Sequence, residues 1–208
     1  MIDLPDIIQS LEFFDFLRGA PAAYLVMLTA AMILILRDWR WSILFLAIQY
    51  LLAGLLFADV LLPHLAFLQV VVGMFVCLIL YITARQVNWG KLPEDVTSEE
   101  AVLIRKERFV RLGTLILPTD TPFRIFLALI VCLVVWAMSQ GIGLFSSTLT
   151  EPVQMAVLAL VVLGLLALSL TSEPLMAGLG LLTFLTGAEL LYSALDQSAG
   201  MLGLLGIA

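Results

Sequence analysis

The residue with the clearest chemical potential in this 208-residue chain is Glu189, a carboxylate inside a long apolar stretch. The stretch runs from Leu175 to Leu195, and a helix that spans a bilayer needs about 20 apolar residues. An acid at that depth costs at least ~2.5 kcal/mol on the most lenient insertion scale, so it is retained only where it faces protein or water. Glu189 is therefore either a neutral, hydrogen-bonded packing residue or a group that takes up and releases a proton.

Two threonines accompany Glu189 on the same predicted helix. Thr183 and Thr186 lie on the turns just before it, and residues three or four apart share a helix face. We therefore expect these side chains and Glu189 to form one stripe that faces the protein interior. Gln49 falls near the middle of another apolar stretch, where a lone glutamine usually joins neighbouring helices through its amide. Glu189 is thus the candidate proton relay, and the other three residues are its supporting polar neighbours.

The composition is typical of a membrane protein. Hydrophobic residues make up 62% of the sequence and charged residues 12%, and the mean hydropathy is +1.13. A soluble domain is about 25% charged, so the predicted fold class is an all-α, polytopic bundle of transmembrane helices. Six stretches are long and apolar enough to span, at about residues 20–36, 42–58, 65–83, 123–138, 153–170 and 175–195. We expect the apolar tail at 198–208 to be the start of a seventh span, in a chain that continues beyond Ala208.

Two polar segments complete the predicted architecture. Residues 1–19 combine acids with apolar residues at helical spacing, which favours an interfacial helix over a span. Residues 85–123 form a long polar loop, within which 97–113 predicts an amphipathic helix that Thr97 caps and Gly113 ends. That helix either rests on the membrane surface or docks another subunit. The chain accordingly divides into residues 1–19, 20–84, 85–123 and 124–208.

The sequence offers no motif for a cofactor or a metal. Cys77 and Cys132 are isolated within apolar stretches, and His64 has no second His or Cys placed to share a metal. The net charge is -6, which gives no reason to expect a nucleic acid partner. We therefore expect no cofactor, no metal site, no nucleic acid and no catalytic activity of the chain on its own.

The distribution of basic residues predicts the orientation. Every Lys and Arg except Arg18 falls after the first span, in the long loop or at the edge of the fourth span. Positive residues concentrate on the cytoplasmic side of a membrane protein. We therefore expect the N-terminus outside and the loop at 85–123 in the cytoplasm.

Two parts of the chain resemble membrane subunits of respiratory complex I. Residues 37–81 are similar to the second and third helices of the J-type (chain 6) subunit, with a short charged turn, S-x-L…A-G-L-L and then F-L-Q-V-V-V-G. Residues 153–195 resemble the first two helices of the small K-type subunit, with a tight polar turn and then G-x-E-L-L-x-x-A from Gly187 to Ala194. Related pairs occur in membrane-bound hydrogenases and cation/proton antiporters. In the J-type helix small residues follow the glycine and form a bulge, whereas here Met74 follows.

The resemblance implies a subunit of a complex I-like, hydrogenase-like or antiporter-like assembly in an inner or cytoplasmic, energy-transducing membrane. Such a subunit, surrounded by other membrane subunits and lipid, helps to conduct protons or cations while its partners carry out redox chemistry. Glu189 would take the place of the K-type proton-relay glutamate. Two alternatives remain: a purely structural subunit that anchors a larger complex, and an independent small transporter built on a repeat.

The topology can be tested by labelling introduced cysteines from each side of the membrane. Single cysteines at Ser98 and Ser147 are expected to react from opposite sides, with Ser98 cytoplasmic, because one predicted span, residues 123–138, lies between the two loops. Impermeant maleimides applied to intact cells and to inverted vesicles provide the measurement. Labelling of both positions from the same side would contradict the six-span arrangement.

Overall fold

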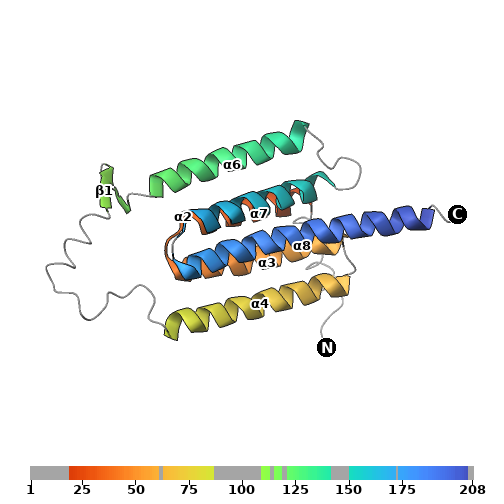
Figure 1. Ribbon diagram of the computed structural model, residues 1–208, viewed down its shortest axis with the longest axis horizontal. Coiled ribbons are helices and arrows are strands. Elements are labelled where there is room, and N and C mark those ends of the chain that lie inside the picture. Colours follow the sequence, from red (N-terminus) through yellow and green to blue (C-terminus); the bar gives the residue numbers. More distant parts are fainter. Residues whose placement is uncertain are drawn as a thin grey trace, which may run out of the picture.

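The computed structural model describes residues 19–60, 63–86, 109–112, 115–118, 121–141, 150–171 and 173–205. Within these ranges the chain forms six helices and one β-hairpin (Figure 1). The helices are α2 (Ala20–Ile35), α3 (Trp39–Val60), α4 (Pro63–Gln86), α6 (Thr121–Gly141), α7 (Glu151–Ser169) and α8 (Pro174–Leu205). The hairpin strands are β1 (Phe109–Leu112) and β2 (Leu115–Pro118), which pair antiparallel.

Five of the described helices are long and apolar enough to cross a membrane: α3, α4, α6, α7 and the Pro174–Leu195 part of α8. The predicted class, a helical protein compatible with a membrane, is confirmed. The remaining helix, α2, has 16 residues, or about 24 Å of helix against a hydrocarbon core of about 30 Å. The number of complete spans therefore stays a prediction.

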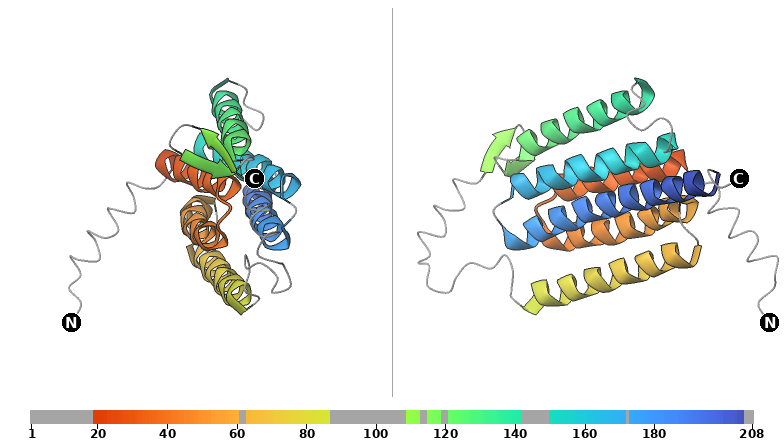
Figure 2. Two further views of the ribbon diagram at one scale, coloured as in Figure 1. Left: turned by 90° about the vertical axis from the view of Figure 1, so that its left-hand side faces the viewer. Right: turned by 45° about the vertical axis from the view of Figure 1, so that its right-hand side comes forward.

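Successive helices run up and down, with α2, α3, α7 and α8 packed together and α4 and α6 on opposite flanks (Figures 1 and 2). The strongest packing is between α7 and α8, and α3 contacts α2, α4 and α8. The apolar windows of α3 and α7 are 56% buried, whereas those of α4 and α6 are 17% buried. The inner helices therefore form the core, and the outer two present mostly apolar faces to their surroundings.

The predicted amphipathic helix at 97–113 is wrong over its last turn, because Phe109–Leu112 is the strand β1. In the hairpin Phe109 lies opposite Pro118, and Leu112 lies opposite Leu115. Phe109 and Val110 before Gly113 and the β-branched Ile116 after it favour paired strands over helix. The rest of the predicted helix, 97–108, and the predicted interfacial helix over residues 1–18 lie outside the described residues.

The predicted seventh span is also wrong over residues 198–205, because α8 continues without interruption to Leu205. No proline interrupts this part of the sequence, and an acid or an amide in a helix interior costs only tenths of a kcal/mol, about 0.7 at most. At 32 residues, α8 is about 48 Å long and exceeds the hydrocarbon core. Its C-terminal part accordingly projects past the ends of the other helices (Figure 1).

Glycines allow the backbones of α7 and α8 to approach closely. A Cβ at Gly164 would lie 2.5 Å from the backbone nitrogen of Phe184, and one at Gly180 would lie 2.8 Å from that of Leu168. A Cβ at Gly187 would meet the Leu160 Cβ at 2.7 Å. Small residues at helix contacts are the usual means of strong pairing in lipid, where apolar burial gives little drive.

This contact yields a prediction with a control on the same helix. The substitution Gly180→Val is expected to destabilise the protein by roughly 1–3 kcal/mol or more, because its side chain must displace the α7 backbone. Gly178→Val is expected to have little effect, since a Cβ there meets no atom within 4 Å. The measurement is the fraction of full-length chain that stays extractable in mild detergent after membranes are heated through a temperature series. Equal midpoints for the two variants would refute the close-packing role.

Candidate functional site

Three fully buried polar side chains lie across the middle of the bundle and are called the polar layer: Gln49 of α3 with Thr183 and Thr186 of α8. They lie between two apolar core clusters. One cluster contains Leu46 and Leu179, and the other contains Ala53 and Leu190. On α3, Gln49 lies between Leu46 and Ala53, and on α8 the two threonines lie between Leu179 and Leu190. All three polar residues are on the buried face of their helix, so along α3 and α8 they lie where one cluster ends and the other begins.

The polar layer differs from the predicted stripe in its hydrogen bonds. The Thr183 hydroxyl donates to the Leu179 carbonyl at 2.9 Å, and the Thr186 hydroxyl donates to the Leu182 carbonyl at 2.9 Å. Both threonines therefore bond to their own helix. Gln49 was expected to join helices through its amide, but neither its oxygen nor its nitrogen has a hydrogen-bond partner among the described residues.

Glu189 does not face the interior as predicted: its side chain is exposed at the edge of the bundle. The reason is the rotation of α8. From Gly180, which lies against α7, the helix turns about 900° to Glu189, so the acid points roughly half a turn away from α7. Thr183 and Thr186, at intermediate angles, face inward. The prediction failed because three residues turn a helix by about 300°, which leaves Glu189 about 60° from Thr186 and on the neighbouring side of the helix.

The partner of Glu189 is Gln69 of α4, whose amide nitrogen donates to one carboxylate oxygen. The Gln69 side chain is partly buried, and it is a lone amide in an apolar helix, as Gln49 is. The spacing of apolar residues alone did not indicate that it would reach the acid. This hydrogen bond joins α4 to α8, two helices that are both packed on α3.

Tyr50 connects this contact to the polar layer. Its side chain is 6% exposed, and its hydroxyl lies within interaction range of Thr186 and Glu189. A Cβ at Gly73 would collide with the Tyr50 ring, and one at Gly54 would collide with Val70, so glycines bring α3 and α4 together here. The helix α4 is α-helical throughout its length, with no bulge at Gly73. Sequence reasoning missed Tyr50, because an aromatic residue in an apolar stretch has no distinguishing signal.

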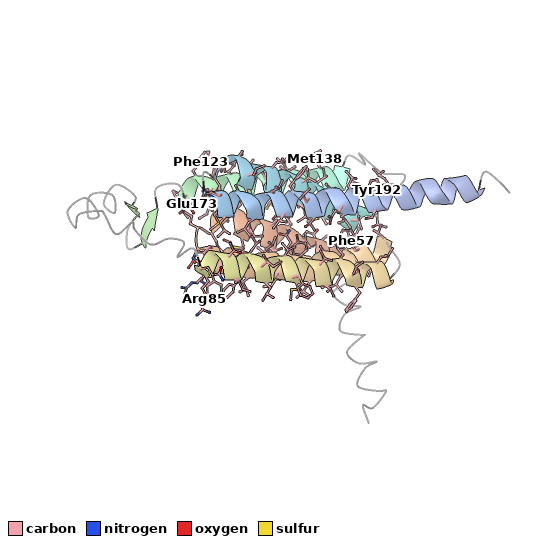
Figure 3. All side chains as sticks on the ribbon, turned by 60° about the horizontal axis from the view of Figure 1, so that its bottom comes forward. Phe57, Arg85, Phe123, Met138, Glu173 and Tyr192 are labelled. Atoms are coloured by element: carbon pink, nitrogen blue, oxygen red, sulfur yellow. The ribbon has the colours of Figure 1, made fainter. Side chains whose placement is uncertain are left out.

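A second polar group lies at the end of the bundle where α2 ends and α6 begins. Arg124 is 9% exposed and donates to the Leu34 carbonyl at 3.3 Å and to the Leu170 carbonyl at 2.8 Å. It therefore caps the C-terminal carbonyls of α2 and α7, where a positive charge also suits the helix dipoles. Arg37 and Glu173 form an ion pair at 4.0 Å beside it. This group fixes helix ends and lies at the opposite end of the bundle from Tyr192 (Figure 3).

The described side chains contain no group of three or more His, Cys, Asp or Glu that could hold a metal ion. Cys77 is buried and Cys132 is half-buried, and both are free thiols. Among the carboxylates whose side chains the structure describes, only Glu189 lies away from a helix end, the others being Asp38, Asp59, Glu151 and Glu173. The chain matches no known protein-family model, no curated protein and no solved structure.

The contact between Gln69 and Glu189 predicts a specific cross-link. In a chain with Cys77 and Cys132 replaced by alanine, the pair Gln69→Cys and Glu189→Cys is expected to react with a short bifunctional maleimide. A protease site inserted between α4 and α6 allows detection, because cross-linked fragments stay joined after cleavage.

The matched control pairs Gln69→Cys with Leu181→Cys. Leu181 is also exposed on α8 but lies about 12 Å from Glu189 toward the N-terminal end of the helix. The first pair should cross-link and the second should not. Equal yields from both pairs would contradict the placement of α4 beside Glu189.

Proposed function

We propose that this chain is an integral membrane subunit of a complex I-like, hydrogenase-like or antiporter-like assembly. In this proposal Glu189 relays protons, or binds a transported cation, while partner subunits supply the redox chemistry. The observation that carries the proposal is the hydrogen bond between Gln69 and Glu189. Gln69 is the glutamine of the J-like F-L-Q-V-V-V-G stretch, and Glu189 is the acid of the K-like stretch. The two regions of resemblance therefore meet at Glu189, the one carboxylate with a described side chain that lies away from a helix end.

The position of Glu189 within an apolar helix supports a titrating role over that of an ordinary surface residue. Glu189 lies about 22 Å along α8 from Pro174, and Gln69 lies about 9 Å along α4 from Pro63. Both positions fall within the apolar windows of their helices, where an acid is expensive. An amide suits either protonation state, because its N–H groups donate to a carboxylate and its oxygen accepts from a protonated acid. A proton relay needs both states to be accessible.

The exposure of Glu189 favours a subunit over an independent transporter. A transporter of this size would hold its acid within its own bundle, between its repeats. Here the acid lies on the outer edge, beside α4. Since an acid facing lipid would be costly, we infer that a partner subunit or a water-filled space between subunits covers this edge.

The arrangement of arginines supports the proposed orientation. Arg37, Arg40, Arg85 and Arg124 all lie at the end of the bundle where α2 and α4 finish and α3 and α6 begin, and Figure 3 shows Arg85 there together with Glu173. By the positive-inside tendency this end faces the cytoplasm. Glu189 then lies in the outer half of the membrane, nearer the end where α4 begins.

The relay is tested by replacing the acid with its neutral isostere. Glu189→Gln keeps size and hydrogen bonding but removes titration, so the assembled complex should lose most of its proton translocation. Glu189→Asp should retain part of it, because the charge survives with a shorter reach. The measurement is proton uptake by inverted vesicles energised with the substrate of the partner subunits, normalised to complex recovered through a tag on this chain.

The control is Glu173→Gln, the same substitution at the residue directly before α8 and at the arginine end, where the acid is partly exposed and paired with Arg37. This variant should assemble and translocate normally. Full translocation by a correctly assembled Glu189→Gln variant would reject the relay and leave the structural subunit as the better description.

A further inference from the structure

Gln49 carries a buried amide that the described residues leave without hydrogen-bond partners. Its side chain is 0% exposed, and both amide atoms lack a hydrogen-bond partner among the described residues. Placing an unpaired amide in an apolar environment is strongly unfavourable. Buried polar groups in proteins are paired, with protein or with ordered water, in the large majority of cases. The amide therefore indicates a bound ligand in the polar layer.

The chemistry of the polar layer identifies the kind of ligand. The Gln49 nitrogen requires an acceptor and its oxygen requires a donor. Thr183 and Thr186 have already committed their hydroxyl hydrogens to backbone carbonyls, so their oxygens can only accept. Water both donates and accepts, and a buried water typically makes about 3 hydrogen bonds. A cation would serve only the oxygen atoms and leave the amide N–H groups unpaired.

We propose that the polar layer is an internal hydration site in which Gln49 of α3, at the level of Thr183 and Thr186 of α8, binds one or more water molecules. The site is closed above and below by the two apolar clusters, which contain Leu46 with Leu179 and Ala53 with Leu190. Thr186 of this layer lies within interaction range of Tyr50, which in turn lies within range of Glu189.

The location gives the water a role that rests on the proposed function. A proton released by Glu189 toward the bundle would be accepted by the Tyr50 hydroxyl oxygen, and Tyr50 would release its own hydroxyl hydrogen to water in the polar layer. The hydration itself does not depend on that role, because it follows from the unpaired amide. The site and the relay can therefore fail independently.

The test is hydroxyl-radical footprinting of the full chain in its native membranes, with radicals generated from water by a short X-ray pulse. Leu46, one turn before Gln49 on the same face of α3, is compared with Leu34 and Leu163 in the apolar core. All three leucines are at most 1% exposed, so bulk water reaches none of them. We expect Leu46 to be oxidised several-fold faster than the other two, because only Leu46 adjoins bound water.

The variant Gln49→Met removes both amide groups while keeping an unbranched side chain of similar length, and it should abolish the excess labelling of Leu46. Gln154→Met is the matched control, since Gln154 is also a buried amide with an unpaired nitrogen but lies near the start of α7. That variant should leave the labelling of Leu46 unchanged. Labelling of Leu46 no faster than that of Leu34 in the unmodified protein, or excess labelling that persists in Gln49→Met, would overturn the proposal. Neither outcome depends on the translocation measured with Glu189→Gln.

Discussion

The close approach of α7 and α8 is the contact on which the arrangement of this bundle depends. In lipid, apolar side chains gain little from packing on one another, so backbones that can touch determine which helices pair. Gly164 of α7 and Gly180 of α8 make that contact possible. Once this face of α8 lies against α7, the rotation of α8 about its axis is fixed, and with it the directions of its other side chains. The threonines are buried inside the bundle, and Glu189 lies at the edge where α4 passes.

The helices could be predicted from the sequence because each is a long apolar run bounded by charged or proline-containing turns. Their predicted and observed bounds differ by a few residues at most, apart from α8. The hairpin at Phe109–Pro118 was not predicted, since acids followed by bases and a terminal glycine also describe a surface helix. The length of α8 was missed for a related reason. Asp196 and Gln197 suggested a loop at the membrane surface, but neither residue breaks a helix.

The candidate site could be predicted only in part. Glu189 was identified because acids are rare in apolar helices, and the burial of Thr183 and Thr186 followed from their spacing. The direction of the Glu189 side chain could be predicted only by knowing which face of α8 packs on α7. That face is determined by glycines, and their contacts can be seen only in the folded chain. Its partner, Gln69, is 120 residues away in sequence. No local pattern relates two residues at that distance.

The polar side chains of the bundle fall into two groups that differ in what they require from their surroundings. Hydroxyls such as Thr183, Thr186 and Ser193 donate to carbonyls of their own helix, so they are satisfied wherever that helix is placed. Gln69 and Arg124 bond across helices and therefore fix the position of one helix against another. Gln49 has neither kind of partner in the described chain. A membrane interior supplies no substitute for a missing hydrogen-bond partner. The side chains of Gln49, Gln69 and Arg124, together with Glu189, therefore carry more information about function than the more numerous hydroxyls.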